Sequence, residues 1–104
     1  MSYTTFSMVT GKLVIYELNH LPLKERNRFC RRFYGWNDRA NGGKYTYSRA
    51  GFLEDVPFVR PEKSVLIIRN EDVGRVLAFL HEYDAQSHIR DVTLTEDDLQ
   101  ELGM

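Results

Sequence analysis

The chain has 104 residues, of which 42% are hydrophobic and 28% charged, and its net charge is −1. This length predicts a single domain over residues 1–104. No apolar run approaches the roughly 20 residues that a membrane-spanning helix needs, and the first residues lack the basic-then-apolar order of a secretory signal. Cys30 is the only cysteine, so no disulfide forms within the chain. Together these features exclude a membrane protein and favour a cytoplasmic location.

The near-neutral total hides two segments of opposite charge. Residues 24–49 contain eight lysines and arginines against two acidic residues, a net charge of +6. Residues 70–104 contain two arginines against nine acidic residues, a net charge of −7. Such a division gives the molecule a directional field, so a polyanion would meet one side of it. The alternative is that the two segments attract each other, within one chain or between subunits.

The first half of the chain predicts a strand, a helix and a second strand. "KLVIYELN" (residues 12–19) is rich in β-branched and aromatic residues, as strands are. Pro22 suits the first turn of a helix, which we expect to end near Tyr34. Its apolar positions, at spacings of three, four and seven, predict a buried side formed by Leu23, Cys30, Phe33 and Tyr34. On that side Cys30 would be inert packing. "NGGKYTYSR" (residues 41–49) predicts a turn followed by a strand.

The second half predicts a strand, a helix, a weaker strand and a short tail helix. A loop with two prolines leads to the strand "SVLIIRN" (residues 64–70). The next segment, "EDVGRVLAFLHEY" (residues 71–83), has helical spacing and two acidic residues at its start, where they favour the helix dipole. "SHIRDVTL" (residues 87–94) is a weaker strand. Thr95 and Asp98 then have the spacing of a capping box at the start of the tail helix.

This order predicts an α+β, ferredoxin-like βαββαβ fold: an antiparallel sheet with two helices on one face, and a short C-terminal helix. The two continuous apolar runs, "LVIY" and "VLII", would be the first and third strands, which lie in the middle of such a sheet. Both faces of these strands are apolar, so the face without helices needs a cover. A homodimer is the prediction, and the alternative is that the N-terminal segment or the tail helix folds over this face.

A basic and aromatic surface is the main candidate site. Lys24, Arg28, Arg31 and Arg32 share one side of the first helix. Arginines hold phosphates and rings stack on unpaired bases, so this pattern favours nucleic acid, with DNA or RNA left open. The candidate nucleic-acid-binding residues are Lys24, Arg28, Arg31, Arg32, Trp36, Arg39, Lys44, Tyr45, Tyr47 and Arg49. The structural alternatives are a solvated helix face, tyrosines packed in an edge strand, and Trp36 anchoring a loop to the core.

The sequence gives less support for an enzyme than for nucleic-acid binding. Glu17 and His20, near the end of the first strand, are the weak catalytic candidates, but one carboxylate beside one histidine does not make a metal site. No histidine has the spacing of a catalytic triad or of a metal site. We therefore predict no cofactor and no metal, and lean against catalysis.

"KLVIYELN" followed directly by a helix, and "SVLIIRN" before the second helix, resemble the small CRISPR-associated nuclease and spacer-integration family. The resemblance is one of topology over most of the chain, and it implies a ferredoxin-like homodimer that binds nucleic acid. Some members use a metal-dependent aspartate at the end of the first strand, where this chain has Glu17 and Asn19. The segment "YGWNDRANGGKYTYSRAGFLEDVP" has no counterpart in the family.

The sequence as a whole favours a small dimeric nucleic-acid-binding protein. A non-catalytic protein-interaction or regulatory module is the alternative, and a metal-dependent nuclease is the third reading.

Overall fold

The computed structural model of the chain describes residues 9–40 and 45–104, and for residues 37–40 and 45–49 it describes the backbone alone. The chain divides into two compact units. The first, the sheet unit, consists of Met1–Leu18 and Pro57–Met104. The second, the helix–hairpin unit, consists of Asn19–Val56. Each is described by itself below.

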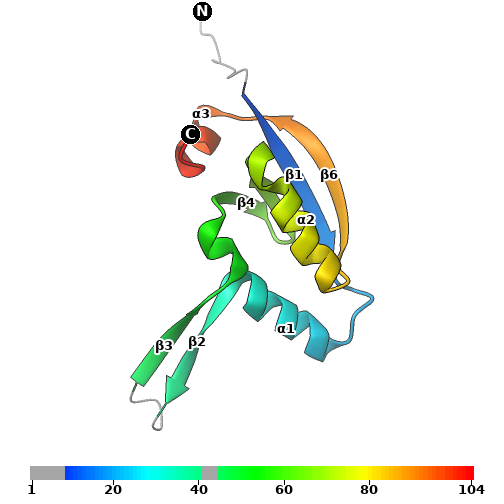
Figure 1. Cartoon of the computed structure of the whole chain (residues 1–104), viewed down its shortest axis with the longest axis vertical. Coiled ribbons are helices and arrows are strands. Elements are labelled where there is room, and N and C mark those ends of the chain that lie inside the picture. Colours follow the sequence, from blue (N-terminus) through cyan, green and yellow to red (C-terminus); the bar gives the residue numbers. More distant parts are fainter. Residues whose placement is uncertain (1–8, 41–44) are drawn as a thin grey trace, which may run out of the picture. The chain divides into compact units, whose positions relative to one another are not determined.

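The sheet unit is built on four antiparallel strands, in the order β4-β5-β1-β6 (Figure 1). The strands are β1 (Thr10–Glu17), β4 (Phe58–Glu62), β5 (Val65–Ile68) and β6 (Gln86–Thr93). The two apolar runs, β1 and β5, lie in the middle, as the sequence predicts. The α+β, ferredoxin-like fold is confirmed, because this strand order and these directions are those of a ferredoxin-like sheet.

One edge of the sheet differs from the prediction. We expected the strand at residues 44–49 to form this edge, but β4 does so, within the segment that its two prolines marked as a loop. The ladder between β4 and β5 is interrupted between Val59 and Glu62. Pro61 lies in this irregularity, where an edge strand tolerates a residue that cannot donate a hydrogen bond.

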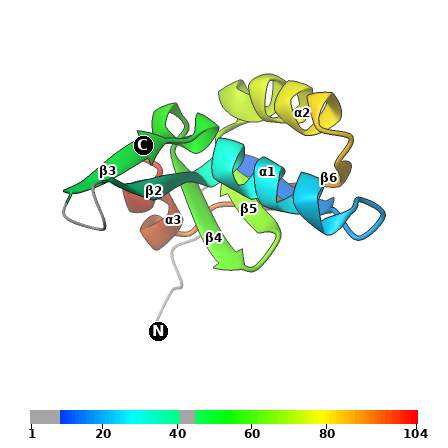
Figure 2. The same ribbon diagram turned by 90° about the horizontal axis from the view of Figure 1, so that it is seen from below.

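The core of the sheet unit lies on one face of the sheet. Val14 and Leu66 lie opposite each other in β1 and β5 and are fully buried, and Ile68 on the same face is fully buried too. Helix α2 (Val73–Glu82) lies along the sheet and contributes its buried Val76 and Leu80 (Figure 2). Burying large aliphatic side chains of this kind stabilises a fold by about 1.5–3 kcal/mol each.

The other face of the sheet is covered at one end by the C-terminal segment. A methyl group added at Gly11 would come within 2.9 Å of the Leu94 side chain, so Leu94 covers the face that Gly11 shares with Leu13 and Ile15. Helix α3 (Glu96–Glu101) follows and contacts β4. Further along the same face, Leu13 is half-buried and Ile15 is 38% exposed. The tail therefore covers this face only in part.

The predicted capping box is confirmed at the start of α3. The backbone N–H of Asp98 donates to Thr95 Oγ1 at 3.1 Å, and the backbone N–H of Thr95 donates to Asp98 Oδ2 at 3.0 Å. Two of the N–H groups that a helix start leaves without partners are thereby satisfied. This explains why a helix of only six residues forms directly after β6.

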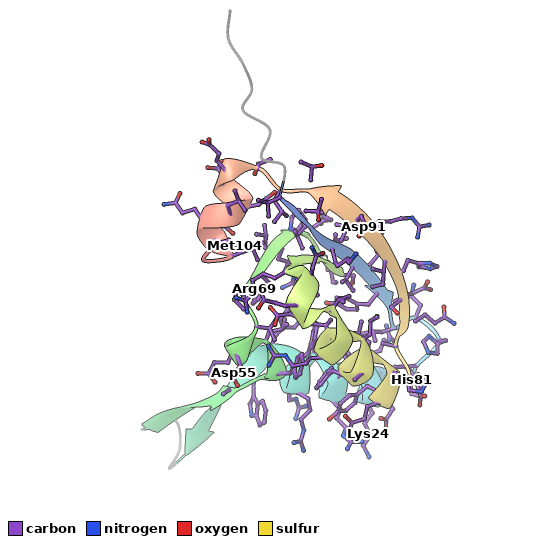
Figure 3. The ribbon with its side chains drawn as sticks, turned by 45° about the horizontal axis from the view of Figure 1, so that its top comes forward. Lys24, Asp55, Arg69, His81, Asp91 and Met104 are labelled. Carbon is purple, nitrogen blue, oxygen red and sulfur yellow. The ribbon has the colours of Figure 1, made fainter. Side chains whose placement is uncertain are left out.

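A buried carboxylate precedes α2. Asp72 is 2% exposed and lies in the 3-10 turn η2 (Asn70–Asp72). Its Oδ2 accepts a hydrogen bond from Arg69 Nε at 2.8 Å, and its Oδ1 accepts one from Arg75 Nη2 at 2.7 Å; Arg69 is labelled in Figure 3. Burial raises the pKa of Asp72, but the hydrogen bonds and the positive charges of the two arginines together lower it more, so the pKa lies below its ordinary 3.8.

The helix–hairpin unit consists of α1 (Leu23–Tyr34), β2 (Gly35–Ala40), β3 (Tyr45–Ala50) and the 3-10 turn η1 (Phe52–Asp55). Strands β2 and β3 pair as a separate antiparallel hairpin, so residues predicted as a loop form a strand. Aromatic rings form the core of this unit. Phe33 is fully buried, lies 5.0 Å from Phe29 between ring centroids, and stacks on Phe52 at 6.1 Å.

The predicted buried side of α1 is partly wrong. Phe33 is buried as expected, but Phe29 is the second fully buried residue, while Cys30 is exposed and Leu23 is 63% exposed. Phe29 and Phe33 are one helical turn apart, so they define one narrow stripe. The expected stripe began at Leu23 and passed through Cys30. It is therefore rotated around the helix relative to the stripe that Phe29 and Phe33 form.

Within residues 9–40 and 45–104, no helix is long and apolar enough to cross a membrane.

Candidate nucleic-acid interface

The solvent-exposed side of α1 carries the four predicted cations. Lys24, Arg28, Arg31 and Arg32 are all exposed, and they lie away from the buried Phe29 and Phe33. Figure 3 labels Lys24 at the beginning of this helix. Arg28 approaches Glu25 at 3.9 Å. Among the described residues, none forms an ion pair with Lys24, Arg31 or Arg32.

These cations belong to a unit with a strong positive charge. The helix–hairpin unit contains eight lysines and arginines against four acidic residues, a net charge of +4. The sheet unit contains six against eleven, a net charge of −5. The boundary between the two compact units is therefore also a boundary between charges of opposite sign. The charge of the helix–hairpin unit attracts a polyanion, and the charge of the sheet unit repels one.

The described rings of the helix–hairpin unit serve its core. Phe29 and Phe33 are fully buried, and Phe52 is half-buried against Phe33. Tyr34 is half-buried and meets Phe33 edge-on at 5.0 Å. Trp36 is also half-buried. Much of the aromatic content of this segment is thus explained by packing, whereas its exposed arginines are not.

The remaining candidate residues belong to the hairpin, whose backbone pairing places them along its two strands. Trp36 lies opposite Arg49, Asp38 opposite Tyr47, Arg39 opposite Thr46, and Ala40 opposite Tyr45. Arg49 and Trp36 are therefore close to α1, whereas Arg39 and Tyr45 are further out along the hairpin. Lys44 lies outside the described residues.

Two glycines join the hairpin to α1 without a loop. The N–H of Gly35 donates to the carbonyl of Arg31, which ends the helix, and Gly35 has φ 90° and ψ 175°. Only glycine adopts this conformation without strain. Gly51 follows the second strand of the hairpin at the same end, and a Cβ on it would lie 2.3 Å from the Gly35 nitrogen and 2.6 Å from the Phe33 carbonyl oxygen. Neither glycine's role was predicted from the sequence, although a glycine directly after a helical pattern is a known signal of a helix end.

The two catalytic candidates lie at the end of β1 and just after it. Glu17 is the last residue of β1, and both it and His20 are exposed. In the part of the chain that the structure describes, no group of three or more histidine, cysteine, aspartate or glutamate side chains could hold a metal ion.

The chain matches no protein-family model, no curated protein and no solved structure. The resemblance to the CRISPR-associated family stays a prediction.

Proposed function

We propose that this protein binds nucleic acid through the exposed cationic side of α1 and the adjoining hairpin. The observation that carries the proposal is a difference between cationic side chains in their ion-pair partners. Lys24, Arg31 and Arg32 have no ion-pair partner among the described residues, whereas Arg69 and Arg75 share a buried carboxylate. Unpaired arginines with planar, multiple donors are suited to phosphate oxygens.

The location of the arginines also has a structural explanation, which is weaker. Arg31 and Arg32 lie in the last turn of α1, where cations interact favourably with the helix dipole. That effect is worth about 0.3–1 kcal/mol and needs one charge near the helix end. It does not account for Arg28 and Lys24, which lie on the same side of the helix about one and two turns earlier.

The test is a binding titration with fluorescently labelled DNA and RNA oligonucleotides at several salt concentrations. Affinity should fall steeply with salt, because each neutralised phosphate releases condensed counterions. The double variant Arg31→Ala/Arg32→Ala should bind more weakly and should flatten the salt dependence by up to about two phosphate contacts.

The matched control removes two positive charges from the sheet unit, as Lys63→Ala/Arg90→Ala; both residues are exposed. It changes the net charge equally and should retain most of the affinity. If the two double variants lose affinity equally, only the total charge matters and α1 is not the interface. If the wild type ignores nucleic acid at low salt, the proposal fails.

The opposite charges of the two units favour a second candidate, a protein-interaction module. In that case the basic unit of one copy would meet the acidic unit of another, and removal of Arg31 and Arg32 would dissociate the assembly. Light scattering of the wild type and of the Arg31→Ala/Arg32→Ala variant, in the absence of nucleic acid, separates the two candidates.

We also propose that the protein is a cytoplasmic homodimer. The half-buried Leu13 and the 38% exposed Ile15 lie on the sheet face that the C-terminal segment covers only in part, and a second copy would bury them. Light scattering should then give about twice the 12.2 kDa chain mass.

The relationship to the CRISPR-associated family stays within this proposal. A nuclease activity has less support than nucleic-acid binding, because Glu17 and His20 would need further ligands to hold a metal ion. Cleavage that depends on a divalent cation and is lost in Glu17→Gln would reverse that ranking.

A further inference from the structure

We propose that α1 binds a single strand of nucleic acid, with the phosphates on its cations and the bases turned toward a neutral flank formed by Leu23, Asn27 and Cys30. This inference rests on the proposed function. It adds that the bases of the ligand, and not only its phosphates, contribute to binding, and it makes Asn27 a base-contacting residue.

The first step is that α1 has three sides of different chemistry. At 3.6 residues per turn, successive side chains lie about 100° apart around the helix. Phe29 and Phe33 are fully buried and define the core side. Measured around the helix from that side, the exposed cations lie at about 180–280° and the exposed uncharged residues at about 80–140°. The cations are Lys24, Arg28, Arg31 and Arg32, and the uncharged residues are Leu23, Asn27 and Cys30.

The two other charged residues of α1 do not change this division. Arg26 is half-buried beside the core side, and its Nε is buried. Glu25 lies at the far edge of the cations, where it approaches Arg28 at 3.9 Å. A row of positive charge therefore runs for about 12 Å along the helix, and the neutral flank runs beside it for about 10 Å.

The second step is that this division fits one phosphate backbone better than two. A helix in the major groove, which is about 12 Å wide, has a backbone on each side. The neutral flank of α1 would then lie against one of these backbones without a cation to offset its charge. In a duplex the bases also pair with each other and face inward. A single strand has one row of phosphates, and its unpaired bases are free to turn toward the neutral flank.

The third step is that the neutral flank has the chemistry of a base-binding surface. Leu23 is 63% exposed, the largest exposed fraction among the large apolar side chains that the structure describes, and it offers an apolar contact to a base. Asn27 is exposed one turn further along, and its amide both donates and accepts hydrogen bonds, as the edges of bases do. The rise from Leu23 to Asn27 is about 6 Å, so the two side chains can contact neighbouring bases of one strand.

The experiment compares oligonucleotides that have the same phosphates but differ in their bases. The ligands are a mixed-sequence single strand, the same strand with abasic sites throughout, and the duplex of that strand with its complement. Each is made as DNA and as RNA, and the comparison uses the sugar that the wild type binds more tightly.

Two double variants separate base contacts from a general effect of substitution. The neutral-flank variant is Leu23→Ala/Asn27→Ala. Its control is Gln100→Ala/Met104→Ala, which likewise removes one exposed amide and one exposed apolar side chain, but from the sheet unit. Circular dichroism verifies that both variants are folded.

The wild type should bind the normal single strand about tenfold more tightly than the abasic strand, and also more tightly than the duplex. The neutral-flank variant should lose about tenfold on the normal strand and match the wild type on the abasic strand, because only base contacts are gone. Arg31→Ala/Arg32→Ala should lose affinity for both strands, because both carry phosphates. The control should match the wild type on every ligand.

Three results would each overturn the inference and leave the proposed function standing. They are equal affinity of the wild type for the normal and abasic strands, tighter binding of the duplex than of the single strand, and an equal loss by the neutral-flank variant on both strands. Absence of binding by the wild type to any of the ligands would overturn the proposed function as well.

Discussion

The sheet unit and the helix–hairpin unit use their charged residues in different ways. In the sheet unit Lys12 pairs with Asp91 across two strands, and Asp72 binds Arg69 and Arg75 before α2. In the helix–hairpin unit, Lys24 and Arg31 project from α1 with no ion-pair partner among the described residues. These ion pairs of the sheet unit join its own residues, whereas Lys24 and Arg31 of the helix–hairpin unit are exposed on the surface of α1.

The two units also differ in how their cores are built. The buried residues on the sheet, such as Val14, Leu66 and Ile68, are aliphatic and come from strands far apart in the sequence. The core of the helix–hairpin unit is formed by Phe29, Phe33 and other rings within one short segment. A segment rich in arginine and aromatic residues can thus contain two separate groups: rings that form the core of a small unit, and arginines that are exposed on its surface.

The largest expected effect is on the aromatic core. Phe33→Ala should lower the free energy of unfolding by about 3–5 kcal/mol, because it removes a fully buried ring that contacts Phe29 and Phe52. Chemical denaturation followed by the fluorescence of Trp36 measures the change. Leu23→Ala, at a 63% exposed position on the same helix, should cost less than about 0.5 kcal/mol. Similar costs for the two variants would contradict the assignment of the core.

A smaller effect is expected at the buried carboxylate of the sheet unit. Asp72→Asn should cost about 2 kcal/mol near neutral pH, because hydrogen bonds to a buried charge are lost. The pKa of Asp72 is lowered in the folded protein, so its stabilisation is present above pH 3.8 and is lost as the pH falls below that value. The wild type and the variant should therefore converge in stability in acid.

The control for Asp72 is its neighbour Glu71, which is 67% exposed and 3.7 Å from Arg69. Glu71→Gln should change the stability by less than about 0.5 kcal/mol, because exposed ion pairs are screened by solvent. A pH-independent difference between the wild type and Asp72→Asn would contradict the role given to the carboxylate.

The smallest effect is expected at the start of α3. Thr95→Ala should cost about 1 kcal/mol through loss of the side-chain cap, whereas Thr95→Ser should be close to the wild type because its hydroxyl is retained. Thermal unfolding of the two variants is the measurement. Equal losses in both would show that the methyl group of Thr95, and not its hydroxyl, is what matters.

The sequence predicted best those features that depend on neighbouring residues. The capping box of Thr95 and Asp98 follows from a spacing of three, and the central strands follow from continuous apolar runs. The cationic side of α1 also follows from helical spacing alone. These signals are local, so no tertiary contact is needed to interpret them.

Features that depend on tertiary pairing were missed. The strand β4 contains Pro61, which is typical of loops, and only its pairing with β5 reveals it. Residues 35–40 include turn-forming residues such as Asn37 and Asp38, and they become a strand only by pairing with β3. The burial of Phe29 instead of Cys30 depends on packing against neighbouring rings, which the sequence does not specify. The two junction glycines likewise acquire their role only from the approach of Gly51 to the helix end.

The most direct test of the central claim is a nuclear magnetic resonance titration of the isotope-labelled protein with the oligonucleotide that binds best. We expect the backbone amide signals that shift to belong to α1 and the hairpin, from Lys24 to Arg32 and around Trp36 and Arg49. Signals of β1, β5 and β6 should remain in place. Shifts concentrated on these strands, with α1 unaffected, would contradict the account and move the binding surface to the sheet.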